Sequence, residues 1–365
     1  MTDREFVCSQ CGAPLTFDPG SNALKCGNCG HGNQLVNRAA AAVEQDFEKF
    51  LRAARERAPM VTEQSVRCGA CGAETLVAAH IKSTRCPFCD SPLVTQADSR
   101  ALIKPQGLLP FRVSRSQAVE SFQSWVKGLW FAPSKLKAYA RTKSSQLKGI
   151  YVPYWTFDSH TRSEYVGARG DDYYTTESRT VTVGGRRETR QQQVRHTRWT
   201  PVSGVSHNAF DDVLVMASNA VPREHADALE PWDLSAAVAP EDKYLAGFQT
   251  EVYRVDLERG FGYAREKMDR AIRAAIGREI GGDHQRIVSV STRHDGVTFK
   301  HLLLPIWISA YHYGQQTYRF LINGRSGQVR GERPYSWIKI AAAVLAGALA
   351  IAAGYWAINY FHLLQ

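Results

Sequence analysis

The eight cysteines constrain this chain more than any other feature of its sequence. All of them fall in four Cys-x-x-Cys pairs within the first 90 of 365 residues, and 14 residues separate the two pairs of each set. The two sets are Cys8, Cys11, Cys26, Cys29 and Cys68, Cys71, Cys86, Cys89. Each cysteine of the first set recurs 60 positions later, and the motif Cys-x-x-Cys-Gly-Ala recurs with it. This pattern indicates the duplication of one small module.

The spacing predicts two zinc ribbons, each holding one structural Zn²⁺ through four thiolates. Two residues between cysteines allow one tight turn to present both sulfurs at the tetrahedral angle. The residues that follow the pairs suit the left-handed backbone of such a knuckle: Gly12, Gly30, Gly72 and Asp90. Four cysteines close the coordination shell, so these sites are structural and not hydrolytic. A module of some 30 residues is too small to fold without its metal.

Three other uses of such pairs compete with zinc. Disulfides suit secreted proteins, thioredoxin-like redox pairs need a different fold around one pair, and an iron site has the same ligand set. His31 could replace Cys29 as a ligand, but the duplicated module has Ser91 there, so we interpret His31 as a bystander.

A long apolar segment predicts a transmembrane helix over residues 338–358. The 19 residues from Ile340 to Ile358 contain no charged side chain, and aromatic residues flank both ends. A buried, alanine-rich core helix is the alternative. Basic residues precede the segment at Arg325, Arg330, Arg333 and Lys339. The positive-inside rule then places the N-terminal part in the cytoplasm, as a single-pass protein of the bacterial cytoplasmic membrane.

The pattern predicts an α+β chain with five parts. These are zinc ribbon 1 (1–36), a linker helix (37–62), zinc ribbon 2 (63–97), an α+β domain (101–334) and the transmembrane helix (338–358). The α+β domain is expected to hold amphipathic helices at 114–129 and 258–280, with strands between them. The segments 151–155 and 303–307 share an apolar-x-Pro-x-Trp pattern, which suggests that the domain consists of two related halves.

The positive charge lies in the middle of the chain. Of a net charge of +10, residues 101–200 contribute 17 basic against 7 acidic side chains. A predicted hairpin turning at Gly184-Gly185 carries six arginines: Arg179, Arg186, Arg187, Arg190, Arg195 and Arg198. Such a surface can be a solvated face, can contact anionic lipid or a protein partner, or can bind nucleic acid.

No catalytic constellation is evident in the sequence. The chain lacks a phosphate loop, a G-x-S-x-G elbow and an H-E-x-x-H motif. The paired carboxylates Asp171-Asp172 and Asp211-Asp212 are expected to be turn or surface residues, because neighbours on a strand point to opposite faces. The sequence therefore predicts a protein that is not an enzyme.

Several longer motifs resemble one bacterial family. They include YVPYWTFD (151–158), RWTPVSG (198–204), FDDVLV (210–215), TFKHLLLPIWISAYHY (298–313) and GERPYSWIKI (331–340). With the duplicated ribbons, the chain resembles membrane-anchored proteins labelled as transcription-factor-IIB-type zinc-ribbon proteins or as primosomal replication helicase-like proteins. The resemblance implies a component of envelope-associated assemblies. The missing phosphate loop argues against carrying over helicase activity.

Together these features predict a non-catalytic adaptor or scaffold with two structural Zn²⁺. It would recruit a cytoplasmic or membrane protein partner to the bilayer through which residues 338–358 pass. Nucleic-acid binding through the basic hairpin at 179–198 is the alternative.

Overall fold

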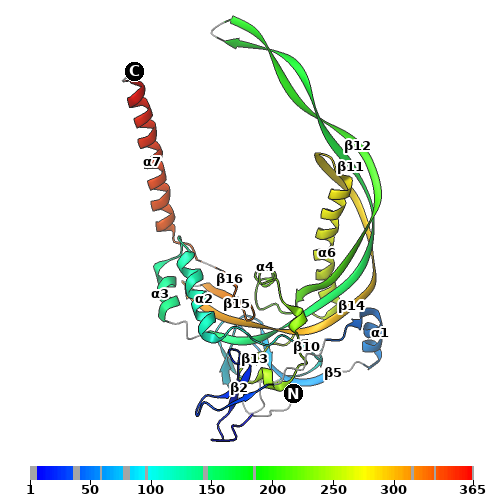
Figure 1. The fold of residues 1–365 in the computed structure, drawn as a ribbon, viewed down its shortest axis with the longest axis vertical. Coiled ribbons are helices and arrows are strands. Elements are labelled where there is room, and N and C mark those ends of the chain that lie inside the picture. The colour runs from blue at the N-terminus through cyan, green and yellow to red at the C-terminus, as the bar shows by residue number, and fades with distance from the viewer. Residues whose placement is uncertain are drawn as a thin grey trace.

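A computed structural model describes residues 6–35, 42–57, 60–76, 83–94, 98–142, 147–183, 186–313, 316–332 and 334–363. It shows a mixed α/β body from which two long arms rise on the same side (Figure 1). One arm is the hairpin of β11 (Lys148–Val183) and β12 (Arg186–Met216), and the other is helix α7 (Trp337–Leu363). The cysteine-rich modules lie on the opposite side of the body.

The first cysteine module is a three-stranded antiparallel sheet. Its strands are β1 (Leu15–Asp18), β2 (Ala23–Cys26) and β3 (Gly32–Gln34), in the order β1-β2-β3. Asn22, between β1 and β2, has a φ of 50°, a left-handed conformation that Asn tolerates in tight turns. The turn brings the two cysteine pairs to one end of the module.

The second cysteine module is built from two small sheets. One has the order β6-β5-β9, with β5 (Met60–Arg67), β6 (Glu74–Leu76) and β9 (Asp98–Ile103). The other pairs β7 (Ser83–Arg85) with β8 (Pro92–Val94). Between the modules, β4 (Gln45–Asp46) and α1 (Phe47–Arg57) occupy part of the predicted 37–62 linker. The linker is therefore not helical throughout, because β5 begins at Met60 and already pairs with β9.

The body is organised around one large antiparallel sheet of the order β12-β11-β14-β15-β16. Its remaining main strands are β14 (His284–Tyr313), β15 (Gln316–Asn323) and β16 (Val329–Gly331). The short strands β10 (Gly107–Leu108) and β13 (Gln249–Thr250) join it in parallel, and β4 pairs with β14. The sheet thus draws on segments that are far apart in the sequence.

The two segments with the shared apolar-x-Pro-x-Trp pattern are neighbours in this sheet. Tyr151 pairs with Pro305 and Pro153 pairs with Leu303 in the antiparallel register of β11 and β14. Their side-by-side position does not by itself establish common ancestry, so the two related halves stay a prediction.

Helices cover the sheet close to where the sequence predicts them. Helix α2 (Arg115–Gly128) begins at Ser114, which forms a capping box with Gln117. Helix α6 (Leu257–Ile280) is capped by Asp256 and ends at Gly281, which has a φ of 66°. The other helical elements are α3 (Ser134–Thr142), α4 (Arg223–Asp227), the 3-10 turn η2 (Leu234–Ala236) and α5 (Asp242–Leu245).

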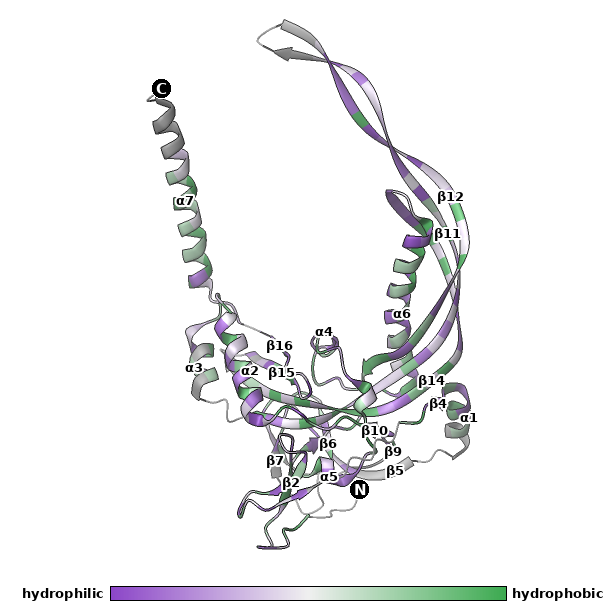
Figure 2. Cartoon of the chain, viewed as in Figure 1, coloured by the Kyte–Doolittle hydropathy of each residue, from purple (hydrophilic) through white to green (hydrophobic). Residues whose placement is uncertain are grey.

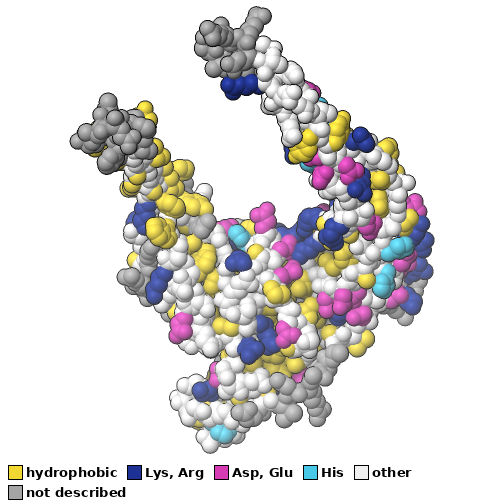
Figure 3. All heavy atoms as spheres, turned by 45° about the horizontal axis from the view of Figure 1, so that its top comes forward, with side chains coloured by type: hydrophobic (Ala, Val, Ile, Leu, Met, Phe, Trp, Pro, Cys, Tyr) yellow, Lys and Arg dark blue, Asp and Glu magenta, His cyan; other side chains and the backbone are white. Residues whose placement is uncertain are grey.

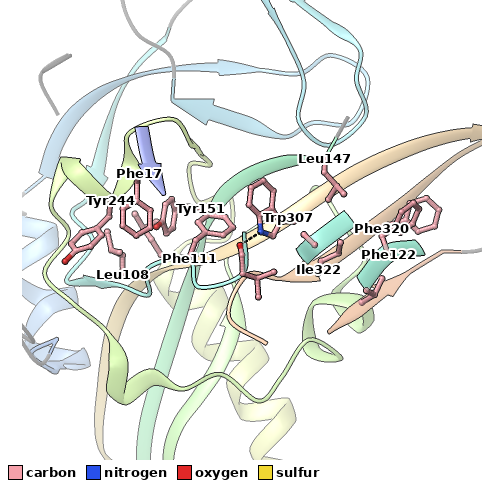
Figure 4. Packing of buried hydrophobic residues seen from close by; sticks show 14 of the residues in the cluster. Phe17, Leu108, Phe111, Phe122, Leu147, Tyr151, Tyr244, Trp307, Phe320 and Ile322 are labelled. Atoms are coloured by element: carbon pink, nitrogen blue, oxygen red, sulfur yellow. Dashed lines mark hydrogen bonds between the residues drawn. The ribbon is translucent and has the colours of Figure 1, made fainter. Parts of the chain in front are cut away.

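Several aromatic side chains pack together in the part of the core that contacts the first cysteine module. Phe111 stacks on Phe248 with ring centroids 4.2 Å apart, and Tyr151 and Trp307 complete the contact. Trp307 Nε1 donates to the carbonyl oxygen of Val113 at 2.9 Å, so the buried indole N–H is satisfied (Figure 4). Phe17 of the first module packs into the same cluster, and the first module is therefore part of the body's core.

The hairpin of β11 and β12 extends beyond the rest of the sheet. Pairing of β11 with β14 ends at Gly170 and His284, whereas pairing of β11 with β12 continues to Val183 and Arg186. At roughly 3.3 Å per residue, the 36 residues of β11 follow a path of roughly 120 Å. Beyond residue 170 the arm is a two-stranded ribbon, here called the distal hairpin (171–199).

Helix α7 exposes its apolar side chains between Trp337 and Trp356. Residues Trp337–Trp356 form a segment of mean hydropathy 1.9 that is long and apolar enough to cross a membrane, and none of it is buried. Val344, Leu345 and Leu349 are each about two-thirds exposed. Figure 2 shows the contrast with the distal hairpin, whose residues are mostly polar. This exposure disfavours the alternative of a buried core helix.

Candidate metal centres and their surroundings

Each set of four cysteines converges on one point. In the first set, Cys8 Sγ lies 3.6 Å from Cys29 Sγ, and Cys11 Sγ lies 3.5 Å from Cys26 Sγ. In the second set, the corresponding distances are both 3.6 Å, for Cys68 with Cys89 and for Cys71 with Cys86. Tetrahedral zinc with Zn–S bonds of about 2.3 Å requires sulfurs about 3.8 Å apart. The four sulfurs of each set could therefore bind one Zn²⁺.

The four knuckles share one backbone geometry. In the first, Gly12 N donates to Cys8 O at 2.9 Å and Cys8 N donates to Ala13 O at 2.8 Å. The same pair of bonds recurs at Cys26, Cys68 and Cys86. The residue after each pair has a positive φ: 72° at Gly12, 77° at Gly30, 75° at Gly72 and 59° at Asp90. The predicted left-handed positions, including Asp90, are thus confirmed.

Hydrogen bonds from backbone or side-chain donors favour thiolate at one cysteine of each cluster. The N–H groups of Cys29 and Asn28 lower the pKa of Cys26 to about 6. In the second cluster, a hydrogen bond from the Cys86 thiol lowers the pKa of Cys71 to about 5. Thiolate is the form that binds metal, so each cluster holds at least one sulfur prepared for coordination at neutral pH.

The two clusters differ in burial. Cys11 and Cys29 of the first cluster are exposed, whereas Cys68, Cys86 and Cys89 of the second are buried. Three cysteines of the second cluster belong to a core cluster that also includes Ile150 and Leu304 of the large sheet. The second cluster is therefore embedded in the body, whereas the first has two cysteines in the core, Cys8 and Cys26, and two that open toward solvent.

The first module is attached to the body by a backbone bond and an aromatic contact. Phe17 N donates to Ala246 O at 2.9 Å, and the Phe17 and Tyr244 rings meet edge-on at 5.4 Å. Gly247 has a φ of 85° and lies so close to Thr16 that a Cβ atom added at position 247 would be 2.9 Å from Thr16 Cβ. A glycine at 247 is what permits this approach.

The second module is attached by charged and polar contacts. Lys148 Nζ lies 3.1 Å from Asp90 Oδ1 and donates to Cys86 O at 3.3 Å. Arg319 Nε donates to Phe88 O at 3.3 Å. Arg254 Nη1 lies 2.7 Å from Glu74 Oε2, and the other Glu74 oxygen accepts from Ser65 Oγ at 2.6 Å. The module thus contacts both β11 and β15, as well as the segment after β13.

The hairpin arginines lie on the distal hairpin, as its sequence pattern predicts. Arg179 and Arg190 are exposed and are direct cross-strand partners. Arg195 lies 3.5 Å from Asp172, and the Arg198 guanidinium lies 5.3 Å from the centre of the Tyr173 ring. The side chains of Arg186 and Arg187 lie outside the described residues. Figure 3 shows basic and acidic side chains side by side along this arm.

Three aromatic residues lie at the first turn of α7: Trp130, Phe131 and Trp337, here called the aromatic collar. The sequence pattern identifies only Trp337 as part of it. Trp337 is 79% exposed, and Trp130, from the turn between α2 and α3, is 83% exposed. Ser336 N donates to Phe131 O at 2.8 Å and Lys339 Nζ donates to Ala132 O at 2.7 Å. These bonds place Trp130 and Phe131 at the first turn of α7. The sequence does not predict this contact, because about 200 residues separate the two segments.

Asp211 and Asp212, which were expected to be turn or surface residues, belong to an acidic cluster. Asp158, Asp211 and Asp212 bring their carboxylates together, and Asp212 has a φ of 52° at a bulge in β11 and β12. Lys300 Nζ lies 2.7 Å from Asp212 Oδ1 and 3.1 Å from Glu44 Oε1. Burial alone would lower the pKa of Lys300, but the surrounding carboxylates outweigh it and raise the pKa. The lysine ammonium thus occupies the position that a cation would take.

Two buried ionisable residues, Glu251 and His301, were missed by sequence reasoning. Burial raises the pKa of Glu251 to about 8 and lowers the pKa of His301 to about 4, so both are mainly neutral at pH 7. Glu251 Oε1 accepts from Ser218 Oγ at 2.5 Å, and His301 Nδ1 lies 2.9 Å from Ile103 O. Both line a cavity of about 550 Å³ beside the cysteine modules. Nothing in the local sequence distinguishes these residues from surface ones.

The fold and its clusters define a class: a mixed α/β chain with two tetracysteine clusters and one exposed apolar helix. The chain is similar to the uncharacterized protein YdjG of Bacillus subtilis (strain 168), with 26% identity over 347 residues that cover 92% of each chain. No family model matches the chain, and no solved structure matches it.

Proposed function

We propose that this protein is a membrane-anchored, zinc-binding adaptor that recruits a cytoplasmic partner to the inner membrane. The observation that carries the proposal is the separation of two features on one body. The tetracysteine modules lie on one side, and the exposed apolar helix α7 rises from the other (Figure 1). With α7 in the bilayer, the first module would face the cytoplasm at the far end.

The chemistry of the clusters supports a structural role for zinc. Four sulfurs within 4.8 Å of one another leave no position for a bound water, so the metal would hold a docking surface and not activate a nucleophile. The second module is buried in the body and would stabilise it. The first module, with exposed Cys11 and Cys29, offers the surface that is free for a partner.

The aromatic collar supports the anchor. Tryptophan is enriched at the boundary between the acyl chains and the headgroups. Trp130 and Trp337 would occupy this boundary, while Lys339 would remain at the cytoplasmic headgroups. The resemblance to bacterial membrane-anchored zinc-ribbon proteins belongs to the same proposal.

The proposal is tested by recovering partners from detergent-solubilised membranes. The intact chain should retain a reproducible protein partner, and a variant with charged residues on the first module (Asn28→Glu, Lys25→Glu) should lose it. Changes on the opposite face, at Lys127 and Lys135, serve as the matched control. Failure to recover any reproducible partner with the intact, zinc-loaded chain would contradict the adaptor role.

A second candidate function concerns the distal hairpin. Arg179 and Arg190 are exposed cross-strand partners on the distal hairpin, and Arg195 and Arg198 follow on the same strand as Arg190. The hairpin rises from the same side of the body as α7, so anionic lipid headgroups are the partner that we favour for these arginines. Nucleic acid is the alternative partner. A chain ending at residue 334 should bind phosphatidylglycerol vesicles and release them with salt, and the double change Arg179→Gln, Arg190→Gln should weaken binding severalfold. Salt-dependent binding to DNA or RNA, without binding to vesicles, would favour nucleic acid instead.

A further inference from the structure

The cavity beside the cysteine modules has the size and lining of a small-molecule site. Its volume of about 550 Å³ falls within the range of ligand pockets. Its walls come from four regions of the chain. Phe6 belongs to the first cysteine module, Leu76 to the second, Tyr253 to the segment after β13, and Leu303 to the central strand β14.

The polar groups in the wall are buried and incompletely satisfied. His301 is 3% exposed and Glu251 is 2% exposed. Among the described residues, His301 Nε2 and Glu251 Oε2 have no hydrogen-bond partner. A buried polar atom without a partner costs about 1–3 kcal/mol, which a ligand that satisfies it would recover.

The hydrogen bond of Nδ1 determines which ring nitrogen of His301 carries the proton. A carbonyl oxygen can only accept, so Nδ1 must carry the proton that bonds to Ile103 O at 2.9 Å. The Trp155 and Tyr253 rings lie 4.6 and 5.6 Å from the imidazole and hold it in place. In the neutral ring Nε2 is then a lone-pair acceptor. His301 lines the cavity together with walls that are mostly apolar, such as Leu102 and Val252.

We propose that this cavity binds a small apolar molecule carrying a hydroxyl group, an alcohol or a phenol. The hydroxyl donates its hydrogen bond to His301 Nε2, and Glu251 is a second polar residue of the cavity wall. The apolar body of the ligand packs against Leu76, Leu102 and Val252. Because Phe6 and Leu76 line the site, its occupancy would tie both cysteine modules to the large sheet.

The test uses the full chain, zinc-loaded and in detergent, with 4-(trifluoromethyl)phenol as the probe and fluorine NMR as the readout. Empty micelles provide the blank. The control ligand replaces the hydroxyl with a methyl group. The phenol should bind saturably at one site, and the methyl analogue about tenfold more weakly, because one buried hydrogen bond is lost.

Three variants locate the site. His301→Phe should reduce the affinity for the phenol to that of the methyl analogue, and Val252→Trp should abolish binding of both by filling the cavity. His294→Phe, in a separate groove beside α6, should leave both affinities unchanged. Zinc content verifies that each variant is folded, and if Val252→Trp does not fold, the two histidine variants decide. The proposal is overturned if the phenol shows no saturable binding above the micelle blank, if both ligands bind equally, or if His301→Phe binds the phenol as the unchanged chain does.

Discussion

Gly260 of α6 lies against the indole ring of Trp155 of β11, so close that a Cβ at position 260 would be 2.7 Å from Trp155 Cδ1. Trp155 is fully buried, and its Nε1 donates to Val255 O at 2.9 Å. The glycine therefore sets how closely α6 packs on the sheet from which the hairpin rises.

The first prediction concerns this contact. Gly260→Ala should lower the free energy of unfolding by about 1–3 kcal/mol, because either the helix or the fixed indole must shift. Gly262→Ala is the matched control, since nothing lies within 4 Å of its Cβ position. In the same helix it should stabilise by up to about 1 kcal/mol, because alanine is the better helix former. Thermal unfolding of the two variants measures the difference, and equal effects would argue against the close packing of α6.

The second prediction concerns the metals. Elemental analysis should find two zinc ions per chain, one for each tetracysteine cluster. Cys11→Ser should remove one zinc and lower the melting temperature by only about 2–4 °C, because two of the four cysteines of the first cluster are exposed while its module still packs on the core. Cys86→Ser should also remove one zinc but lower the melting temperature by about 5–10 °C, because this cluster belongs to the core. A wild-type chain with iron, or with only one zinc or none, would refute the assignment of two zinc sites.

The third prediction concerns α7. A carbonate wash should release a chain lacking residues 338–365 from membranes, whereas the intact chain should stay with them. The physical reason is the exposed apolar length of Trp337–Trp356, which no described part of the body covers. Zinc content of the truncated chain controls for folding. Retention of the truncated chain on membranes would show that another segment provides the anchor.

The fourth prediction concerns pH. Glu251 has a pKa near 8 in the folded chain and 4.5 as its ordinary value. Between these two values the folded state holds a proton that the unfolded state lacks, so stability falls as pH rises, by about 1.4 kcal/mol per pH unit. The loss levels off above pH 8. Glu251→Gln, which is neutral at every pH, should remove this slope between pH 6 and 8.

Melting temperatures of the unchanged chain and of Glu251→Gln across this window provide the measurement. Parallel curves for the two chains would mean that Glu251 is ionised in the folded protein.

Local signals predicted the local structure. The Cys-x-x-Cys spacing gave the two clusters and their positive-φ positions, because ligand geometry is set within a few residues. The capping residues Ser114 and Gln117 predicted the start of α2, and Gly281 predicted the end of α6. The apolar run after Lys339 predicted a helix over 338–358. In the structure this helix ends at Leu363, slightly beyond the predicted end.

Long-range relationships could not be predicted in this way. The turn at Gly184-Gly185 predicted the pairing of β11 with β12, but the sequence carries no mark of the register of β11 with β14. Lys300 meets Asp212 and Glu44 only because β4 pairs with the same strand. His301 and Glu251 are brought to one cavity by the close packing of both cysteine modules on the sheet. Burial creates their unusual protonation, and burial is a property of the whole fold.

The separation in sequence between paired strands has a consequence for the order of folding. Phe157 pairs with Phe299 across β11 and β14, so this contact must await a loop closure of more than 100 residues. The sulfurs of the first cluster lie within 21 residues of one another, and the second cluster is equally local. We expect metal capture to precede sheet assembly, so that the newly made chain docks its long strands onto modules that already have their shape.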